Sequence, residues 1–133
     1  MPTSPTRVYI IDDEPAVRTA LARLMRSTAM EPFEFASVED FIQADPDLEN
    51  SCTLVDIRMP GISGLELPHL LEERGRSVPI IFITAHDTQE TRALAKQAGA
   101  AAYFRKPVDD QALLDAIEWA LSHPDPTGGA ERS

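Results

Sequence analysis

The chain has 133 residues, of which 43% are hydrophobic and 26% charged, and it carries a net charge of −10. This composition predicts one globular domain, excludes a disordered chain, and argues against direct binding of nucleic acid, which needs clustered Lys and Arg. No apolar run is long enough to cross a membrane, residues 1–6 lack the core of a signal peptide, and the single cysteine allows no internal disulfide, so we expect a cytoplasmic protein.

Short apolar runs alternate with amphipathic stretches along most of the chain. The runs predict strands at residues 7–11, 30–35, 52–56, 78–84 and 101–104. A first helix is expected to start at Pro15, with an apolar stripe of Val17, Leu21, Leu24 and Met25. Four further helices are expected at about residues 37–44, 65–74, 88–98 and 109–122.

This alternation predicts an α/β fold, with one doubly wound, five-stranded parallel sheet and five helices on its two faces. The domain is expected to span residues 7–122. Residues 1–6 would form an N-terminal tail. Residues 123–133 are rich in Pro, Gly and polar residues and are predicted to form a flexible C-terminal tail.

Asp56 ends the buried strand at residues 52–56, and a Pro-Gly turn begins four residues later. The carboxyl ends of parallel strands open on one edge of a sheet, where α/β proteins place their ligands. That edge is also expected to receive Asp12 and Asp13 from the first strand, Thr84 from the fourth and Lys106 from the fifth. Three carboxylates, a hydroxyl and an ammonium should therefore meet in one crevice.

Three neighbouring carboxylates repel one another, and either a raised pKa or a bound cation relieves the repulsion. An all-oxygen set with few protein ligands suits Mg²⁺, which commonly shares its site with phosphate oxygens. Such a site beside a carboxylate and a lysine has the groups needed for phosphoryl transfer. Asp56 is the best candidate nucleophile because it is solitary, whereas the Asp12–Asp13 pair is better suited to holding the metal.

Several motifs in the chain resemble those of response-regulator receiver domains of two-component signalling, in particular the FixJ-like ones. They are Ile11-Asp12-Asp13-Glu14-Pro15, Asp56-Ile57-Arg58-Met59-Pro60-Gly61 with Ser63-Gly64, Ile83-Thr84-Ala85-His86, and Ala98-Gly99-Ala100 with Arg105-Lys106-Pro107. The resemblance covers about residues 7–122. It implies the flavodoxin-like strand order 2-1-3-4-5.

The resemblance implies that Asp56 accepts a phosphoryl group from a histidine kinase or a histidine phosphotransfer protein, forming 4-aspartylphosphate. The reaction would need Mg²⁺, or Mn²⁺ in its place. The implied metal ligands are Asp13 and Asp56 directly, Asp12 through a water molecule, and the backbone carbonyl of Arg58. The protein would then be no enzyme but a phosphoacceptor that assists its own phosphorylation and dephosphorylation.

The resemblance also assigns a switch. Lys106 and Thr84 would bind the phosphoryl group, Tyr103 would turn inward in response, and Arg58 and His86 would tune the phosphate lifetime. The peptide bond between Lys106 and Pro107 would be cis. Phosphorylation would shift the face formed by the fourth helix, the fifth strand and the fifth helix, for partner binding or for a phosphorylation-dependent homodimer.

Two other classes are weighed against this one. An aspartyl-phosphate phosphatase of the haloacid-dehalogenase type also uses an Asp at a strand end, but that family places another acid two residues later, where this chain has Arg58. An FMN-binding flavodoxin would carry a hydroxyl- and glycine-rich first loop, whereas this loop holds three acids.

The output of the domain stays open. A FixJ-like regulator would continue into a helix-turn-helix domain, which these residues do not contain. The chain is expected to be either a stand-alone receiver acting on a downstream protein or the receiver part of a longer regulator, and the first is slightly preferred.

Overall fold

The computed structural model describes residues 5–123, so the expected C-terminal tail beyond His123 lies outside the described residues. Five strands form one parallel sheet: β1 (Arg7–Ile11), β2 (Glu31–Phe35), β3 (Ser51–Asp56), β4 (Ile80–Thr84) and β5 (Ala102–Arg105). Their order is β2-β1-β3-β4-β5, which confirms the predicted topology. β3 is central and buried at every residue, as expected of a strand covered on both faces.

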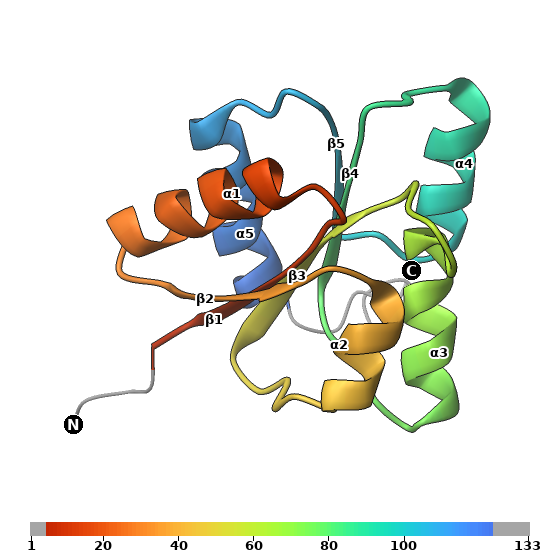
Figure 1. Ribbon diagram of the computed structural model, residues 1–133, viewed down its shortest axis with the longest axis horizontal. Helices are drawn as coiled ribbons and strands as arrows, with labels where there is room; N and C mark the ends of the chain where they lie inside the picture. The colour runs from red at the N-terminus through yellow and green to blue at the C-terminus, as the bar shows by residue number, and fades with distance from the viewer. Residues whose placement is uncertain (1–4, 124–133) are drawn as a thin grey trace.

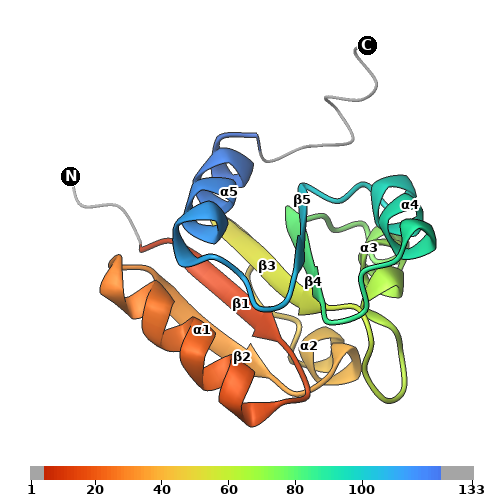
Figure 2. The ribbon, with the colours of Figure 1, turned by 90° about the horizontal axis from the view of Figure 1, so that it is seen from above.

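Five α-helices cover the sheet: α1 (Pro15–Ser27), α2 (Val38–Ala44), α3 (Leu67–Glu73), α4 (Gln89–Gln97) and α5 (Asp110–Ser122). α1 and α5 lie on one face, and α2, α3 and α4 lie on the other (Figures 1 and 2). Three helices begin at a side-chain cap, because Ser37, Thr88 and Asp109 each accept a hydrogen bond from the backbone N–H three residues later. Among the described residues, no helix is both long and apolar enough to span a bilayer.

Most element boundaries lie within one or two residues of the predicted ones, and two of the differences have a clear physical cause. β4 begins at Ile80 rather than at residue 78, because Pro79 has no N–H to donate to a neighbouring strand. The third helix opens with a single 3₁₀ turn, η1 (Gly64–Glu66), and Pro68 falls in the first turn of α3, where the missing N–H costs no hydrogen bond.

Two apolar cores lie on the two sides of the sheet. β3 feeds both of them, because side chains of a strand alternate between faces. Cys52 and Leu54 pack in the core under α1 and α5, and Val55 packs in the core under α2 and α3. These three side chains are at most 1% exposed, so β3 is anchored on both faces before it reaches its carboxyl end.

The predicted apolar stripe of α1 faces the domain, and Leu21 and Leu24 pack against the core that contains Met25. Ala22 and Met25 are buried against the sheet, whereas Val17, Leu21 and Leu24 are only partly buried. The outer residues of the stripe line a groove of about 720 Å³ between α1 and the segment at residues 106–108.

Candidate functional site

The register of the sheet brings four strand ends to one edge. Ile11 pairs with Val55 on β3, so Asp12, which follows Ile11, lies level with Asp56. On the other side of β3, Asp56 pairs with Ile83 of β4. Thr84 pairs with Arg105 at the ends of β4 and β5, and the next backbone N–H, that of Lys106, donates to the Thr84 carbonyl at 2.8 Å. The edge therefore collects the residues that the sequence predicted there.

Three carboxylates meet at this edge. Asp12, Asp13 and Asp56 each offer an oxygen, and these oxygens lie within 4.8 Å of one another. Asp12 and Asp56 are 2% and 6% exposed, while Asp13 is exposed. Two of the three charges are thus held away from bulk water, which is costly unless a cation lies nearby.

Lys106 supplies that cation. Its Nζ lies 2.8 Å from Asp12 Oδ2, 3.4 Å from Asp56 Oδ2 and 3.4 Å from Glu14 Oε1. Burial alone would lower the pKa of Lys106, but the hydrogen bond to Asp12 and the charge of Asp56 outweigh it and raise that pKa. The contact with Glu14 was not predicted, although Glu14 directly follows the two predicted acids.

The electrostatic balance at Asp56 differs from that of an ordinary surface acid. Burial raises its pKa to about 6, the nearby Lys106 opposes this rise, and the charge of Asp12 adds to it. The Arg58 N–H donates weakly to Asp56 Oδ1, at 3.4 Å. Asp56 is therefore ionised above about pH 6. Its carboxylate oxygens accept few hydrogen bonds.

Backbone contacts fix Asp12 from both ends. Its N–H donates to the Phe35 carbonyl at 3.1 Å, and Arg18 Nη1 donates to its carbonyl at 2.6 Å. Its side chain accepts the Glu14 N–H at 2.9 Å. Arg18 also lies 3.6 Å from Glu34, at the edge strand β2. Sequence reasoning missed Arg18, because an arginine outside a helix's apolar stripe usually marks a solvated face.

The loop after Asp56 returns closely to the strand. The Gly64 N–H and the Ser63 hydroxyl both donate to the Ile57 carbonyl, at 3.0 and 3.1 Å. A Cβ atom at Gly64 would lie 2.3 Å from the backbone oxygen of Asp56. Glycine at this position therefore lets the loop close against Asp56 itself, a role that the Ser63-Gly64 motif did not reveal.

Two predicted switch residues lie near the site but make no hydrogen bond with Asp56 among the described residues. Thr84 is buried, and its Oγ1 accepts the His86 N–H at 3.0 Å. Tyr103 donates its hydroxyl proton to Asp87 Oδ1 at 3.0 Å. His86 and Arg58 are exposed beside the crevice. The peptide bond between Lys106 and Pro107 is cis, the geometry that the resemblance implies.

The acidic cluster has the donor set that Mg²⁺ prefers. Its groups are carboxylates, and Mg²⁺ takes oxygen ligands at 2.0–2.1 Å in an octahedron, in which opposite oxygens are about 4.2 Å apart. Oxygens within 4.8 Å of one another fit this requirement with small side-chain adjustments. No cysteine or histidine belongs to this cluster, which disfavours a site built for zinc.

Comparison with known proteins agrees with this geometry. Residues 8–118 match the family model of the response regulator receiver domain. The chain is 39% identical over 115 residues to the transcriptional regulatory protein TdiR of Thauera aromatica, covering 86% of this chain and 51% of TdiR. It is 37% identical over 124 residues to the transcriptional regulatory protein FixJ of Azorhizobium caulinodans, covering 93% of this chain and 59% of FixJ. The chain thus spans little more than half the length of these relatives.

The structural comparison leads to the same family. The fold matches the crystal structure of FixJ-N with a TM-score of 0.82 at 34% identity, covering 91% of this chain and 97% of that one. The matches give no support to the haloacid-dehalogenase alternative. The chain belongs to the family of response regulator receiver domains, the signalling domains of two-component systems.

Proposed function

We propose that Asp56 is the phosphoacceptor of this receiver domain. The observation that carries the proposal is the position of Lys106 Nζ, 2.8 Å from Asp12 and 3.4 Å from Asp56. An ammonium between two buried carboxylates already neutralises negative charge there. It can therefore also stabilise the negative charge of a phosphoryl group that is transferred to one of them.

The transfer forms one bond and breaks one. An oxygen of ionised Asp56 attacks the phosphorus of a phosphohistidine, the P–O bond forms, the P–N bond breaks, and the imidazole leaves with the electrons of that bond. Since its pKa is about 6, Asp56 is ionised at neutral pH and available as the nucleophile. Lys106 exchanges its contact with Asp56 for a phosphoryl oxygen.

Asp12, Asp13 and Asp56 would hold Mg²⁺ (or Mn²⁺), with the Arg58 carbonyl as a further ligand and Asp12 acting through water. The bound metal supplies positive charge against the phosphoryl oxygens. Arg18 and the Phe35 carbonyl keep the backbone of Asp12 in place for this role.

The remaining site residues are proposed to read and limit the signal. The Thr84 hydroxyl, which accepts the His86 N–H, would turn to donate its proton to a phosphoryl oxygen, and Tyr103 would follow it inward. Arg58 and His86, both exposed at the crevice, would control the access of water to the aspartyl phosphate and hence its lifetime. The α4–β5–α5 face would change as a result, for a partner or for a second copy of the chain.

The partners follow from the family. Receiver domains interact with histidine kinases, and we propose a histidine kinase or histidine phosphotransfer protein in the cytoplasm as the donor for this one. The apolar groove between α1 and residues 106–108 suits such a protein donor, because Lys106 borders both the groove and the crevice. We further propose that the domain is a phosphoacceptor rather than an enzyme, with output through a downstream protein or through an attached domain like those of the transcriptional regulators it resembles.

Intact mass spectrometry after incubation with Mg²⁺ and acetyl phosphate tests the proposal. The wild type should gain one phosphoryl group, with no gain in EDTA or in Asp56→Asn. Asp13→Asn should need higher Mg²⁺ for the same yield. A wild type that gains no phosphoryl group and does not bind beryllofluoride would refute the function, and a gain that persists in Asp56→Asn would refute the acceptor.

A further inference from the structure

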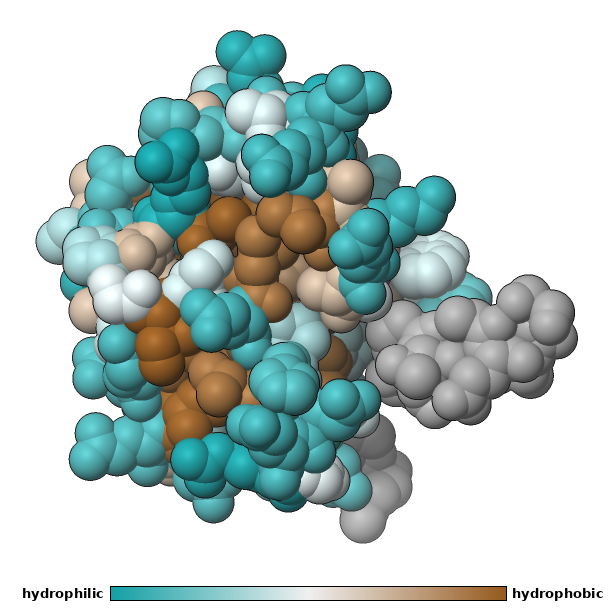
Figure 3. All heavy atoms as spheres, turned by 90° about the vertical axis from the view of Figure 1, so that its right-hand side faces the viewer, coloured by the Kyte–Doolittle hydropathy of each residue, from teal (hydrophilic) through white to brown (hydrophobic). Residues whose placement is uncertain are grey.

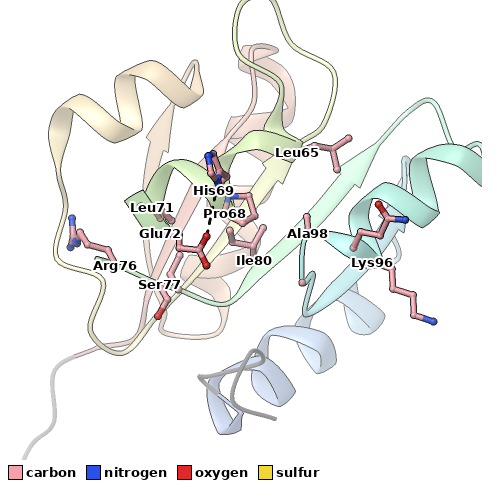
Figure 4. Close-up of a pocket in the computed structure, with 13 residues that line it drawn as sticks. Leu65, Pro68, His69, Leu71, Glu72, Arg76, Ser77, Ile80, Lys96 and Ala98 are labelled. Carbon is pink, nitrogen blue, oxygen red and sulfur yellow. Dashed lines mark ion pairs between the residues drawn. The ribbon is translucent and has the colours of Figure 1, made fainter. Parts of the chain in front are cut away.

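Helix α4 is attached to the rest of the domain by few packed side chains. Among its described residues only Ala95 is buried, and Leu94 is 42% exposed. The face that carries α3 and α4 shows apolar side chains framed by hydrophilic ones (Figure 3). A pocket of about 500 Å³ lies between the two helices, with Leu65 and Leu71 on one side and Ala98 on the other (Figure 4). A helix backed by a pocket can move at little cost in packing.

The N-terminal end of α4 is held by a different kind of contact. Asp87 lies in the loop after β4, and its two carboxylate oxygens each accept a hydrogen bond from Arg92 of α4 at 2.6 Å. One of these oxygens also accepts the hydroxyl proton of Tyr103 on β5, at 3.0 Å. A single carboxylate therefore joins the loop, the helix and the last strand.

The geometry makes this a directional contact, although water screens the Arg92 guanidinium, whose side chain is 64% exposed. The Asp87 side chain is only 9% exposed, and the hydrogen bonds from Arg92 lower its pKa, so it is ionised at neutral pH. A two-point pairing of guanidinium with carboxylate is shorter and more directional than a neutral hydrogen bond. Because Asp87 is three residues after Thr84, and the His86 N–H is bonded to Thr84, the contact reaches the predicted phosphate-binding hydroxyl through a short, ordered loop.

We propose that Asp87 is a positioning residue of the switch, which holds Tyr103 and the first turn of α4 in the arrangement of the unphosphorylated domain. The inference rests on the proposed function and deepens it. Contacts made only in one state favour that state. The contacts of Asp87 therefore lower the population of the activated conformation and weaken the binding of a phosphoryl group, or of its analogue, at Asp56. Phosphorylation, in this scheme, frees Tyr103 from Asp87 as Thr84 turns to the phosphoryl group.

The first test is the affinity for beryllofluoride in the presence of Mg²⁺, measured for the full chain. Asp87→Ala should bind beryllofluoride about fivefold to tenfold more tightly than the wild type, the lower part of the range typical of coupling between sites. Asp87→Asn, which keeps the size of the side chain and one acceptor for Tyr103, should gain less. Glu90→Gln is the matched control, because it removes an exposed carboxylate from the same first turn of α4.

A double-mutant cycle separates positioning from a general effect on the fold. Asp87→Ala and Tyr103→Phe both remove the same hydrogen bond, so their effects on beryllofluoride affinity should combine to less than the product of the two. Equal or weaker binding by both Asp87 variants, or fully multiplicative effects in the cycle, would overturn the proposal.

A spectroscopic measurement tests the contact without any phosphodonor. The chain has two tyrosines, Tyr9 and Tyr103, so fluorotyrosine labelling gives two ¹⁹F resonances. Asp87→Ala should shift the Tyr103 resonance and leave that of Tyr9 in place. If the wild type neither takes up a phosphoryl group nor binds beryllofluoride, the proposed function fails, and this shift still reports whether Asp87 positions Tyr103. If the wild type is phosphorylated but the Asp87 variants match it in affinity, the positioning role alone fails.

Discussion

Strand β3 runs between two apolar cores and then, at its last residue, enters the acidic crevice. Cys52, Leu54 and Val55 are at most 1% exposed and pack among aliphatic and aromatic side chains on both faces of the sheet. Asp56 is nearly as buried, at 6% exposed, but its neighbours are two other acids and Lys106. One short strand thus combines a fully buried apolar environment with a buried charged one.

The two environments contribute to stability with opposite signs. Burial of apolar side chains in the body of β3 stabilises the fold by about 25 cal/mol for each Å² removed from water. Burial of the Asp56 carboxylate raises its pKa to about 6 and so opposes folding at neutral pH. The difference indicates that the body of the strand supplies the stability that lets its end carry charges suited to phosphoryl transfer.

The largest expected effect is in the body of β3. Leu54→Ala should lower the free energy of unfolding by about 3 kcal/mol, through lost burial and the cavity left behind. Urea denaturation measures this loss. Mg²⁺ affinity of the folded fraction should stay close to that of the wild type, because Leu54 faces the core under α1 and α5. A large loss of Mg²⁺ affinity would show that the two environments are not separable.

The next effect couples the two environments. Gly64→Ala should lower the free energy of unfolding by about 2 kcal/mol, since its Cβ would lie 2.3 Å from the Asp56 carbonyl oxygen and the loop would have to move. It should also weaken Mg²⁺ binding, because Asp56 moves with that carbonyl.

A second glycine gives the control for that variant. Gly75 has φ +69 but nothing within 4 Å of an added Cβ. Gly75→Ala should therefore cost about 1 kcal/mol of backbone strain without changing Mg²⁺ affinity. Equal Mg²⁺ affinities in both glycine variants would mean that the close approach of Gly64 does not position Asp56.

The strands and the positions of the residues at their carboxyl ends could be predicted from the sequence. The short apolar runs predicted all five strands, and the parallel arrangement then placed Asp12, Asp56, Thr84 and Lys106 at one edge, where the structure has them. This succeeded because strand direction depends on the pattern of the whole chain, and residues at strand ends inherit their positions from it.

Contacts that depend on loop conformation could not be predicted in the same way. Asp87 meets Tyr103 across 16 positions of sequence, and Arg18 meets the Asp12 carbonyl through a side chain that folds back over its own helix start. Neither contact follows from periodicity, because both are set by the backbone of a turn and by one rotamer. The degree of burial along the α1 stripe could not be predicted for a related reason, since the pattern reports apolar surface but not what covers it.

A smaller effect of opposite sign is expected at the end of the strand. Without Mg²⁺, Asp56→Asn should raise the free energy of unfolding at pH 7 by about 1–2 kcal/mol, because it removes a carboxylate whose burial, together with repulsion by Asp12, costs more than the attraction of Lys106 returns. Added Mg²⁺ should stabilise the wild type and leave Asp56→Asn nearly unchanged. An Asn variant less stable than the wild type in EDTA would contradict the inferred cost of Asp56.

The pH dependence of stability tests the sign of the Asp56 contribution. The pKa of Asp56 rises from 3.8 to about 6 on folding, so the folded protein binds the proton more tightly than the unfolded chain. Stability from this group is therefore complete below about pH 4 and is lost as the pH rises through about 6. The advantage of Asp56→Asn should be full above pH 6 and vanish near pH 4, as measured by urea denaturation in EDTA across this range.

The smallest effect is expected within the body of the strand, at the one described polar side-chain atom that is buried without a partner. Thr53 is 0% exposed, and its Oγ1 has no hydrogen-bond partner among the described residues. Thr53→Val replaces the hydroxyl by a methyl of similar size and should raise the free energy of unfolding by about 0.5–1 kcal/mol. Thr53→Ser keeps the hydroxyl and deletes the methyl, so it should destabilise the domain. If Thr53→Val destabilises the domain and Thr53→Ser leaves its stability unchanged, the hydroxyl of Thr53 stabilises the fold. Apolar burial would then not account for all of the stability that the body of β3 supplies.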